Sequence, residues 1–340
     1  MIIGEAWGRE EAEAGRPFVG PSGRLLWGML SQVGIARSDC YVTNVFNFQP
    51  PANDLKNISG PRADGIPGMP TIGKGKYISQ KYAPELDRLY KEIRDVQPRL
   101  ILALGGTACW ALFQSSGIRN VRGTTAYPNA NTILRVGLHP PPKILPTYHP
   151  AAVLREWSLR PIVLADLHKA RAELAFPEVR RPEREIWIEP TLADLYEFER
   201  QFITPKSTLS IDIETKGNQI TCFGVAPSRD RAIVVPLFIR ETPVKNYWPT
   251  LEEEVEAVKW IRHICALPNA KLGQNFLYDT KFLWQSYGIP VLNIEDDTML
   301  LHHALQPEME KGLGFLGSVY TSEASWKFMR KVTETVKKED

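Results

Sequence analysis

The sequence predicts an α/β fold in two parts, with a mostly parallel sheet in the first half. Strand-like apolar runs alternate with helix-like segments through residues 1–176, a pattern typical of parallel sheets covered by helices. The chain has 340 residues, of which 43% are hydrophobic, so two domains with cores of their own are expected. A proline-rich stretch of mixed charge at residues 174–190 separates the halves.

The elements expected in the first half follow from local patterns of apolar and turn-forming residues. Short apolar or β-branched strands are expected at residues 1–3, 40–46, 100–104 and 144–148. Helices are expected at residues 23–33, 84–96 and 108–114, the last with Thr107 as its N-cap. Residues 52–82, which contain many glycines, prolines and lysines, are expected to form a long loop.

Side chains suited to chemistry come at or near the ends of these strands. Glu5, Asn44 and His149 each fall at a strand end, where open α/β sheets bind their ligands. With Glu11 and Phe18 they supply an aromatic plate, an amide, a hydrogen-bond donor and carboxylates, which together could hold an extruded pyrimidine. Standing alone, Phe18 would be typical of core packing, and His149 of a helix cap or a core position.

Five short motifs carry a family resemblance over residues 1–176. They are GEAWGREEA at 4–12, GRPFVG at 15–20, TNVFNFQPP at 43–51, LGGTA at 104–108 and TYHPAAVL at 147–154. In this order they resemble the uracil-DNA glycosylase superfamily, nearest to family 4. Several motifs in one order are more specific than any single motif. The resemblance implies a three-layer α/β/α fold and uracil-containing DNA as the partner.

The resemblance also implies a role for each matched side chain. Phe18 would stack on the uracil, and Asn44 would pair with its O4 and N3 face. His149 would stabilise O2 as the base departs as an anion. Glu11 would position the attacking water, crowd C5 to exclude the methyl group of thymine, or do both, and Glu5 would support the pocket.

Further positions are carried over from the same motifs. Ala6 and Gly8 would contact the uracil from the turn after the first strand. Val153, Leu154 and Arg155, which follow the His-Pro step, would enter the duplex where the nucleotide had been.

The chain departs from the family pattern at several positions. Trp7 stands where the family has proline, and Ala12 where the motif ends in aspartate. Most family 4 members hold an iron–sulfur cluster with four cysteines, yet Phe48 stands at one ligand position and the N-terminal cysteine pair has no counterpart. We predict no cluster and reduced thiols, because the cysteines lack the local spacing of cluster ligands. The four are Cys40, Cys109, Cys222 and Cys265.

Charge is unevenly distributed although the formal net charge is only +2. Residues 1–176 are basic, and residues 101–150 contain no acidic residue, which suits a polyanionic partner such as DNA. No apolar run is long enough to span a membrane, and no segment resembles a signal peptide. We therefore expect a cytoplasmic protein of a bacterium or of a phage-infected host, without a membrane partner.

The second half carries a separate acidic pattern. Asp212 and Glu214 share one face of an expected strand, and Asn275 and Asp279 share one face of an expected helix. These residues resemble the ribonuclease H-like 3′–5′ exonuclease of family A DNA polymerases, the DEDD group. The resemblance makes Asp212, Glu214 and Asp279 ligands of Mg²⁺ or Mn²⁺ in a two-metal mechanism. The motif with the fourth carboxylate is absent, so the domain is expected to be incomplete.

The predicted organisation is a glycosylase-like domain at 1–176, a linker at 177–190 and an exonuclease-like domain at 191–340. The leading hypothesis is a uracil-DNA glycosylase that hydrolyses the N-glycosidic bond of flipped-out deoxyuridine, in phage-type replication or base-excision repair. A similar domain precedes DNA polymerases of some large bacterial phages. Two alternatives stay open: a non-catalytic DNA-binding or proofreading subunit of a split phage DNA polymerase, and a 3′–5′ exonuclease.

Overall fold

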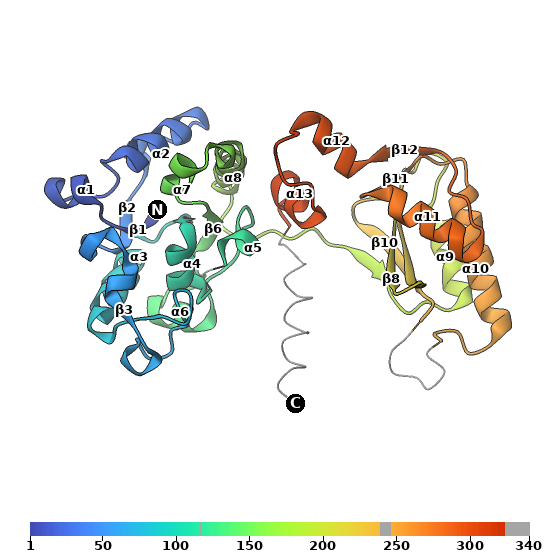
Figure 1. Ribbon diagram of the computed structural model, residues 1–340, viewed down its shortest axis with the longest axis horizontal. Coiled ribbons are helices and arrows are strands. Elements are labelled where there is room, and N and C mark those ends of the chain that lie inside the picture. The colour runs from blue at the N-terminus through green and yellow to red at the C-terminus, as the bar shows by residue number, and fades with distance from the viewer. Residues whose placement is uncertain (116, 239–245, 324–340) are drawn as a thin grey trace. The chain divides into compact units, whose positions relative to one another are not determined.

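The computed structural model describes residues 1–115, 117–238 and 246–323, and the chain forms two compact units (Figure 1). Unit 1 comprises Met1–Val179 and the segment that begins at Gly314, and unit 2 comprises Arg180–Leu313. No helix among the described residues is both long and apolar enough to cross a membrane.

Unit 1 contains a parallel sheet with strand order β2-β1-β5-β6 in its described residues. The strands are β1 (Ile2–Ala6), β2 (Val42–Phe46), β5 (Leu100–Leu104) and β6 (Lys143–Thr147). The helices are α1 (Arg9–Ala14), α2 (Pro21–Gln32), α3 (Ala83–Val96), α4 (Gly105–Phe113), α5 (Ile118–Val121), α6 (Ala130–Val136), α7 (Pro150–Arg155), α8 (Arg160–Glu173) and α13 (Leu313–Tyr320). The predicted α/β class with a mostly parallel sheet is confirmed.

Two hydrophobic cores, one on each face of this sheet, make the three layers. Alternate side chains of a strand point to opposite faces, so Ile3 packs toward α3, α4 and α6 while Ile2 packs toward α2, α7 and α8. Because both faces are covered, β5 and β6 are buried along their whole length, and β5 is apolar throughout.

Two expectations in unit 1 need correction. Thr107 is the third residue of α4 and not its N-cap, because the helix begins at Gly105 and the Thr107 hydroxyl donates to Glu5 instead. Residues 52–82 are more ordered than a solvated loop. They contain short 3₁₀ turns and the antiparallel pair β3 (Ser59–Gly60) and β4 (Tyr77–Ile78), and they bury apolar side chains such as Ile58.

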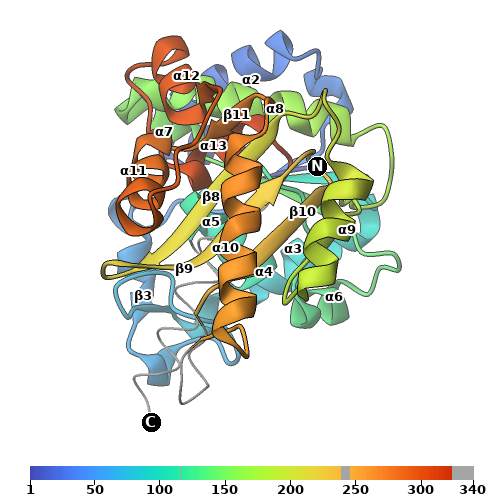
Figure 2. The same ribbon diagram turned by 90° about the vertical axis from the view of Figure 1, so that its right-hand side faces the viewer.

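Unit 2 contains a mixed sheet with strand order β12-β11-β8-β9-β10-β7 among its described residues. The strands are β7 (Glu185–Trp187), β8 (Leu209–Lys216), β9 (Gln219–Ala226), β10 (Arg231–Pro236), β11 (Lys271–Gly273) and β12 (Ile294–Asp297). The helices are α9 (Leu192–Phe202), α10 (Leu251–Ala266), α11 (Phe276–Tyr287) and α12 (Thr298–Leu305). Strands β8, β9 and β10 are antiparallel neighbours, while β11 runs parallel to β8. Figure 2 shows α9 and α10 side by side over this sheet.

The boundaries differ from the predicted domains. Residues 185–187 of the expected linker form β7, which pairs with β10 at the edge of the second sheet. The segment after Leu313 belongs to unit 1, because buried polar groups of unit 1 bind it. Arg122 Nη1 donates to Ser318 Oγ at 2.7 Å, and Lys169 Nζ donates to the carbonyl oxygens of Ser318 at 2.6 Å and Thr321 at 2.5 Å.

A fully buried ion pair supports this attachment. The Arg122 guanidinium contacts both carboxylate oxygens of Asp166, at 2.5 and 3.0 Å, and Thr147 Oγ1 donates to Asp166 at 2.7 Å. Such a pair is costly to break from one side, because the remaining charge is buried without its partner.

We expect Arg122→Met to lower the free energy of unfolding of unit 1 by roughly 3–5 kcal/mol, since Asp166 is left unpaired. Adding Asp166→Leu should recover part of this loss. Lys91→Met, which removes an exposed pair with Asp95, should cost far less, because solvent screens that pair. Urea unfolding measures all three, and equal losses in the Arg122 and Lys91 variants would contradict the assignment.

Candidate active site

A cavity of about 600 Å³ opens in unit 1 at the sheet edge where β1 and β6 end. Eight residues named from the sequence line it: Glu5, Ala6, Gly8, Glu11, Phe18, Asn44, His149 and Arg155. These come from segments as far apart as the first strand and α7, so the fold brings the motifs together in one place.

Gly4 allows the aromatic ring and the amide to meet. It pairs with Asn44 in the β1–β2 ladder. A β-carbon at Gly4 would lie 2.2 Å from Asn44 Oδ1 and 2.6 Å from Phe18 Cζ. Any side chain at this position would therefore displace both groups from the floor of the cavity.

Phe18 is held in an uncommon backbone conformation, with φ of 56°. Its carbonyl accepts a hydrogen bond from Trp27 Nε1 at 3.1 Å, and a β-carbon at Gly23 would lie only 2.0 Å from that carbonyl oxygen. The ring is 4% exposed, packs against the core, and lies 5.9 Å from the His149 ring between centroids. Phe18 is therefore both a core residue and a wall of the cavity.

The backbone around Asn44 is fixed by Arg88 of α3. Arg88 Nη2 donates to the carbonyl oxygens of Asn44 at 2.8 Å and Val45 at 3.0 Å. Asn47 Oδ1 accepts the Asn44 N–H at 3.3 Å. Within the described residues the Asn44 carboxamide itself has no hydrogen-bond partner, so it is available to a ligand in the cavity.

Glu11 ties together the loops at the mouth of the cavity. Its Oε1 accepts the N–H groups of Val19 at 3.1 Å and Gly20 at 2.8 Å, and its Oε2 accepts that of Gly8 at 3.2 Å. Each carboxylate oxygen has two lone pairs, so Oε2 keeps capacity for one further donor such as water. Glu5 is held separately, because Thr107 Oγ1 donates to its Oε2 at 2.5 Å.

His149 is a neutral donor directed by the backbone. It is the N-cap of α7, and its Nδ1 accepts the Ala151 N–H at 3.2 Å. In a neutral imidazole the proton must then be on Nε2. Burial, and then the positive charge of Arg155, lower the pKa of His149 from 6.5 to about 4. The ring therefore offers an uncharged N–H donor at neutral pH.

The duplex-entering segment needs a correction at one position. The Val153 side chain is fully buried in the core formed with α2 and α8, so it cannot leave the protein to enter DNA. Leu154 is 49% exposed and Arg155 is also exposed. Of the three predicted residues, only these two are accessible to a ligand.

The predicted metal site in unit 2 is not assembled. Asp212 and Glu214 lie on the exposed face of β8, as the alternation predicts, yet no three His, Cys, Asp or Glu side chains among the described residues could hold a metal ion. Asp279 Oδ1 accepts the Ile213 N–H at 2.9 Å, which ties this side chain to β8. Burial, and then the charges of Asp212 and Asp297, raise the pKa of Asp279 to about 6.

The residues also do not fit an iron–sulfur cluster. At the ligand position that the resemblance indicates, Phe48 stacks on Tyr82 with ring centroids 5.3 Å apart and packs edge-on against Phe46 at 5.9 Å. In the part of the chain that the structure describes, the cysteines form no group of metal ligands. Aromatic packing therefore occupies this place, and no step of the chemistry is assigned to a cluster.

Several lining residues were missed by the sequence analysis. Arg9, Ser22, Gln49 and Asn53 also border the cavity. Arg9 and Gln49 lie inside the recognised motifs, so the motifs themselves could have indicated them. Asn53 has a positive φ of 55°, which only the coordinates reveal.

Comparisons with known proteins agree with the motifs. The sequence profile of the Uracil DNA glycosylase superfamily matches residues 1–175. A type-4 uracil-DNA glycosylase of Pyrobaculum aerophilum is 35% identical over 165 residues, which are 47% of this chain and 70% of that protein. One of Thermotoga maritima is 34% identical over 176 residues, 51% and 76% of the two chains. Among solved structures, the EXD2 exonuclease domain covers 40% of this chain and 68% of its own, with 18% identity and a TM-score of 0.27, too low to assign a fold.

We expect His149 to titrate with a midpoint near its lowered pKa of about 4. Because this value lies below the ordinary 6.5, the unfolded chain binds the proton first as the pH falls. The contribution of His149 to the free energy of unfolding is then complete above pH 6.5 and decreases as the pH falls toward 4. NMR of ring-labelled histidine measures the midpoint, with His149→Gln to assign the signal. A midpoint at the ordinary value would refute the buried neutral ring.

We expect Phe48→Ala to lower the free energy of unfolding by roughly 2–3 kcal/mol, because the aromatic stack is lost. Protein produced in iron-depleted medium should be as stable as protein produced with iron. Trp157→Ala, at an exposed ring, is the matched control and should change stability by less than about 1 kcal/mol. Stability that depends on iron would show that a cluster is bound after all.

Proposed function

The chain belongs to the uracil-DNA glycosylase superfamily and is a hydrolase, and we propose that unit 1 removes uracil from DNA by hydrolysing the N-glycosidic bond of extruded deoxyuridine. The observation that supports this most is the meeting of Phe18, Asn44 and His149 in one cavity beside Gly4. Uracil-containing DNA is then the partner of unit 1.

Recognition of the base follows from the groups on the cavity floor. The Phe18 ring stacks on the pyrimidine, and the Asn44 carboxamide offers a donor to O4 and an acceptor to N3–H. A cytosine presents the opposite donor and acceptor at these two positions, so the same orientation of the amide rejects it. Arg88 fixes the strand that carries this amide and acts as a positioning residue.

The hydrolysis requires two things from the protein: a hydrogen-bond donor to the departing base and a site that orients the attacking water. When the bond from C1′ to N1 breaks, the bonding electrons stay with uracil, and negative charge develops at O2. The neutral His149 donates its Nε2 hydrogen to O2, which stabilises that charge without prior loss of a proton. Water adds to C1′; the free lone pair of Glu11 orients this water and accepts the proton it loses, and the uracil anion takes up a proton from solvent after it leaves. No lysine lines the cavity among the described residues, which favours water over an amine as the nucleophile.

The DNA backbone meets the exposed side of the same cavity. Arg9 and Arg155 border it and suit phosphates, while Leu154 fills the space that the extruded nucleotide vacates. We propose that the protein acts in DNA repair, in the cytoplasm of a bacterium or of a phage-infected host.

For unit 2 we propose an exonuclease-like, ribonuclease H-type fold. Its support is the mixed sheet, in which the acidic strand β8 lies between the antiparallel β9 and the parallel β11. Because its carboxylates are not gathered for a metal, a non-catalytic DNA-binding or proofreading subunit of a split phage DNA polymerase is the second candidate function for this unit.

We expect the full chain to excise uracil from a single-uracil oligonucleotide in the presence of EDTA, read out by alkaline cleavage. His149→Gln and Asn44→Ala should each slow excision roughly 100-fold or more, because the first removes the backbone-oriented imidazole donor and the second removes the amide that faces the base. Asn131→Ala, at an exposed site on α6, is the matched control and should be fully active. Full activity of Asn44→Ala would contradict the pocket, and a folded chain that binds this DNA without excision would support the non-catalytic candidate.

A further inference from the structure

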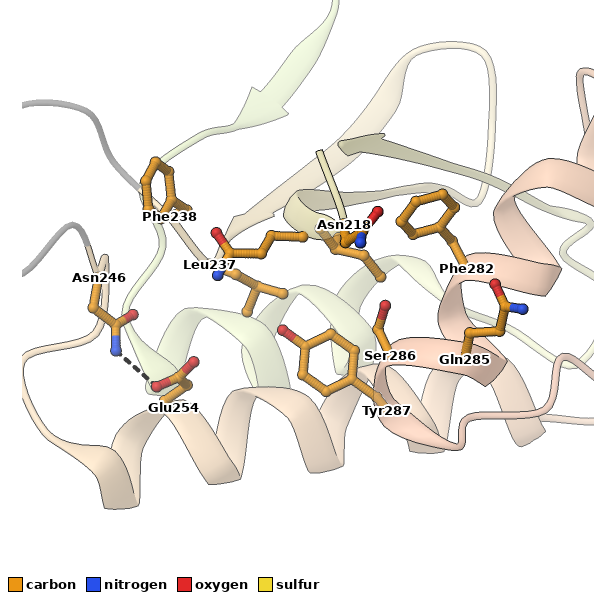
Figure 3. Close-up of a pocket in the computed structure, with 11 residues that line it drawn as sticks. Asn218, Leu237, Phe238, Asn246, Glu254, Phe282, Gln285, Ser286 and Tyr287 are labelled. Carbon is orange, nitrogen blue, oxygen red and sulfur yellow. Dashed lines mark hydrogen bonds between the residues drawn. The ribbon is translucent and has the colours of Figure 1, made fainter. Parts of the chain in front are cut away.

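Unit 2 contains a second cavity, of about 650 Å³ (Figure 3). It is bordered by the start of β9, the end of β10, α10 and the C-terminal half of α11. None of Asp212, Glu214 and Asp279 lines it. Its size is that of a small-molecule site.

Two side chains that line this cavity, Asn246 and Glu254, keep hydrogen-bond acceptor capacity. Asn246 Nδ2 donates to Glu254 Oε2 at 2.7 Å, which fixes the orientation of the amide, because a carboxylate can only accept here. Asn246 Oδ1 is then buried and has no partner within the described residues. Figure 3 shows this amide above Glu254, on one side of the cavity. A ligand with neighbouring N–H groups would satisfy both Asn246 and Glu254.

The remaining lining determines what kind of ligand carries those N–H groups. Among the described residues that line the cavity, Glu254 is the one charged side chain and none is Lys, Arg or His, so this described lining offers no cation to a phosphate group. Phe238 and Phe282 offer flat apolar surfaces from opposite sides of the cavity (Figure 3). Flat rings beside polar edge groups are typical of nucleobase sites.

Tyr287 adds a donor close to the acceptors. Burial, and then the charge of Glu254, raise the pKa of the Tyr287 hydroxyl, so it keeps its proton. In Figure 3 this hydroxyl points toward the side of the cavity that carries Glu254. The cavity thus combines two acceptors with a neighbouring donor, flanked by aromatic rings.

We propose that this cavity binds a guanine base, either as a free nucleoside or as an unpaired base of single-stranded DNA. Guanine is the standard base with two adjacent N–H donors, at N1 and N2, beside the acceptor O6. Glu254 and Asn246 accept the two donors, and the Tyr287 hydroxyl donates to O6. The sugar and any phosphate remain toward solvent. The inference is independent of uracil excision, which belongs to the cavity of unit 1.

Calorimetric titration of the full chain tests the proposal with guanosine, inosine, adenosine and methylguanidinium. Guanosine should bind most tightly, and inosine, which lacks the N2 amine, at least tenfold more weakly. Glu254→Gln is nearly isosteric and should weaken guanosine binding at least tenfold. Glu252→Gln removes the same charge from an exposed position on α10 and should leave binding unchanged.

A second series separates the two sources of the base. Tighter binding of an oligo-dT with one internal dG than of oligo-dT alone, lost in Glu254→Gln, would assign the site to single-stranded DNA. Binding of guanosine without this difference would assign it to the free nucleoside. Equal affinity for all three nucleosides, tighter binding of methylguanidinium, no binding of guanosine, or equal effects of the two glutamate variants would each overturn the proposal. Thermal unfolding of each variant confirms that unit 2 stays folded.

Discussion

The contact of the Gly4 backbone with Asn44 and Phe18 is the constraint on which the candidate active site depends. Strand β1 lies inside a parallel sheet that is covered on both faces, so it offers space to a ligand only where the strand ends. At that end a β-carbon would overlap both the amide and the ring. The Asn44 amide and the Phe18 ring can therefore lie over β1 only because residue 4 is glycine.

Backbone hydrogen bonds keep the cavity in shape before any ligand arrives. Glu11 collects three backbone N–H groups from two loops, and Arg88 donates to two consecutive carbonyls of β2. His149 follows the same principle, since its Nδ1 caps α7 and its other nitrogen is thereby directed outward as a donor. Glu11 and Arg88 thus hydrogen-bond mainly to backbone groups and fix the segments that surround the cavity. A site fixed in this way needs little rearrangement when charge develops on a substrate.

Local sequence patterns were sufficient for the sheet and for most of the cavity. The apolar strands, and the polar residues at their ends, are visible in single segments, and parallel strands bring such ends together. Three features were not visible because they depend on distant contacts. Val153 faces the core. The sequence does not show this, because a short helix has too few residues for a periodic pattern to indicate its buried side. The Thr107 hydroxyl donates a hydrogen bond to Glu5, which is 102 positions away in the sequence. Arg122 donates one to Ser318, which is 196 positions away.

The charges that border the two cavities explain why they suit different parts of a nucleic acid. Arg9 and Arg155 border the cavity of unit 1 together with Glu5, Glu10 and Glu11, and the two arginines suit the phosphates that flank an extruded base. Among its described residues, the lining of the cavity of unit 2 has a carboxylate and no cation, which disfavours an anionic backbone in its interior. An uncharged base edge with hydrogen-bond donors meets no such repulsion. The two proposed ligands therefore rest on the arginines at the cavity of unit 1, since the described lining of the cavity of unit 2 has no such cation.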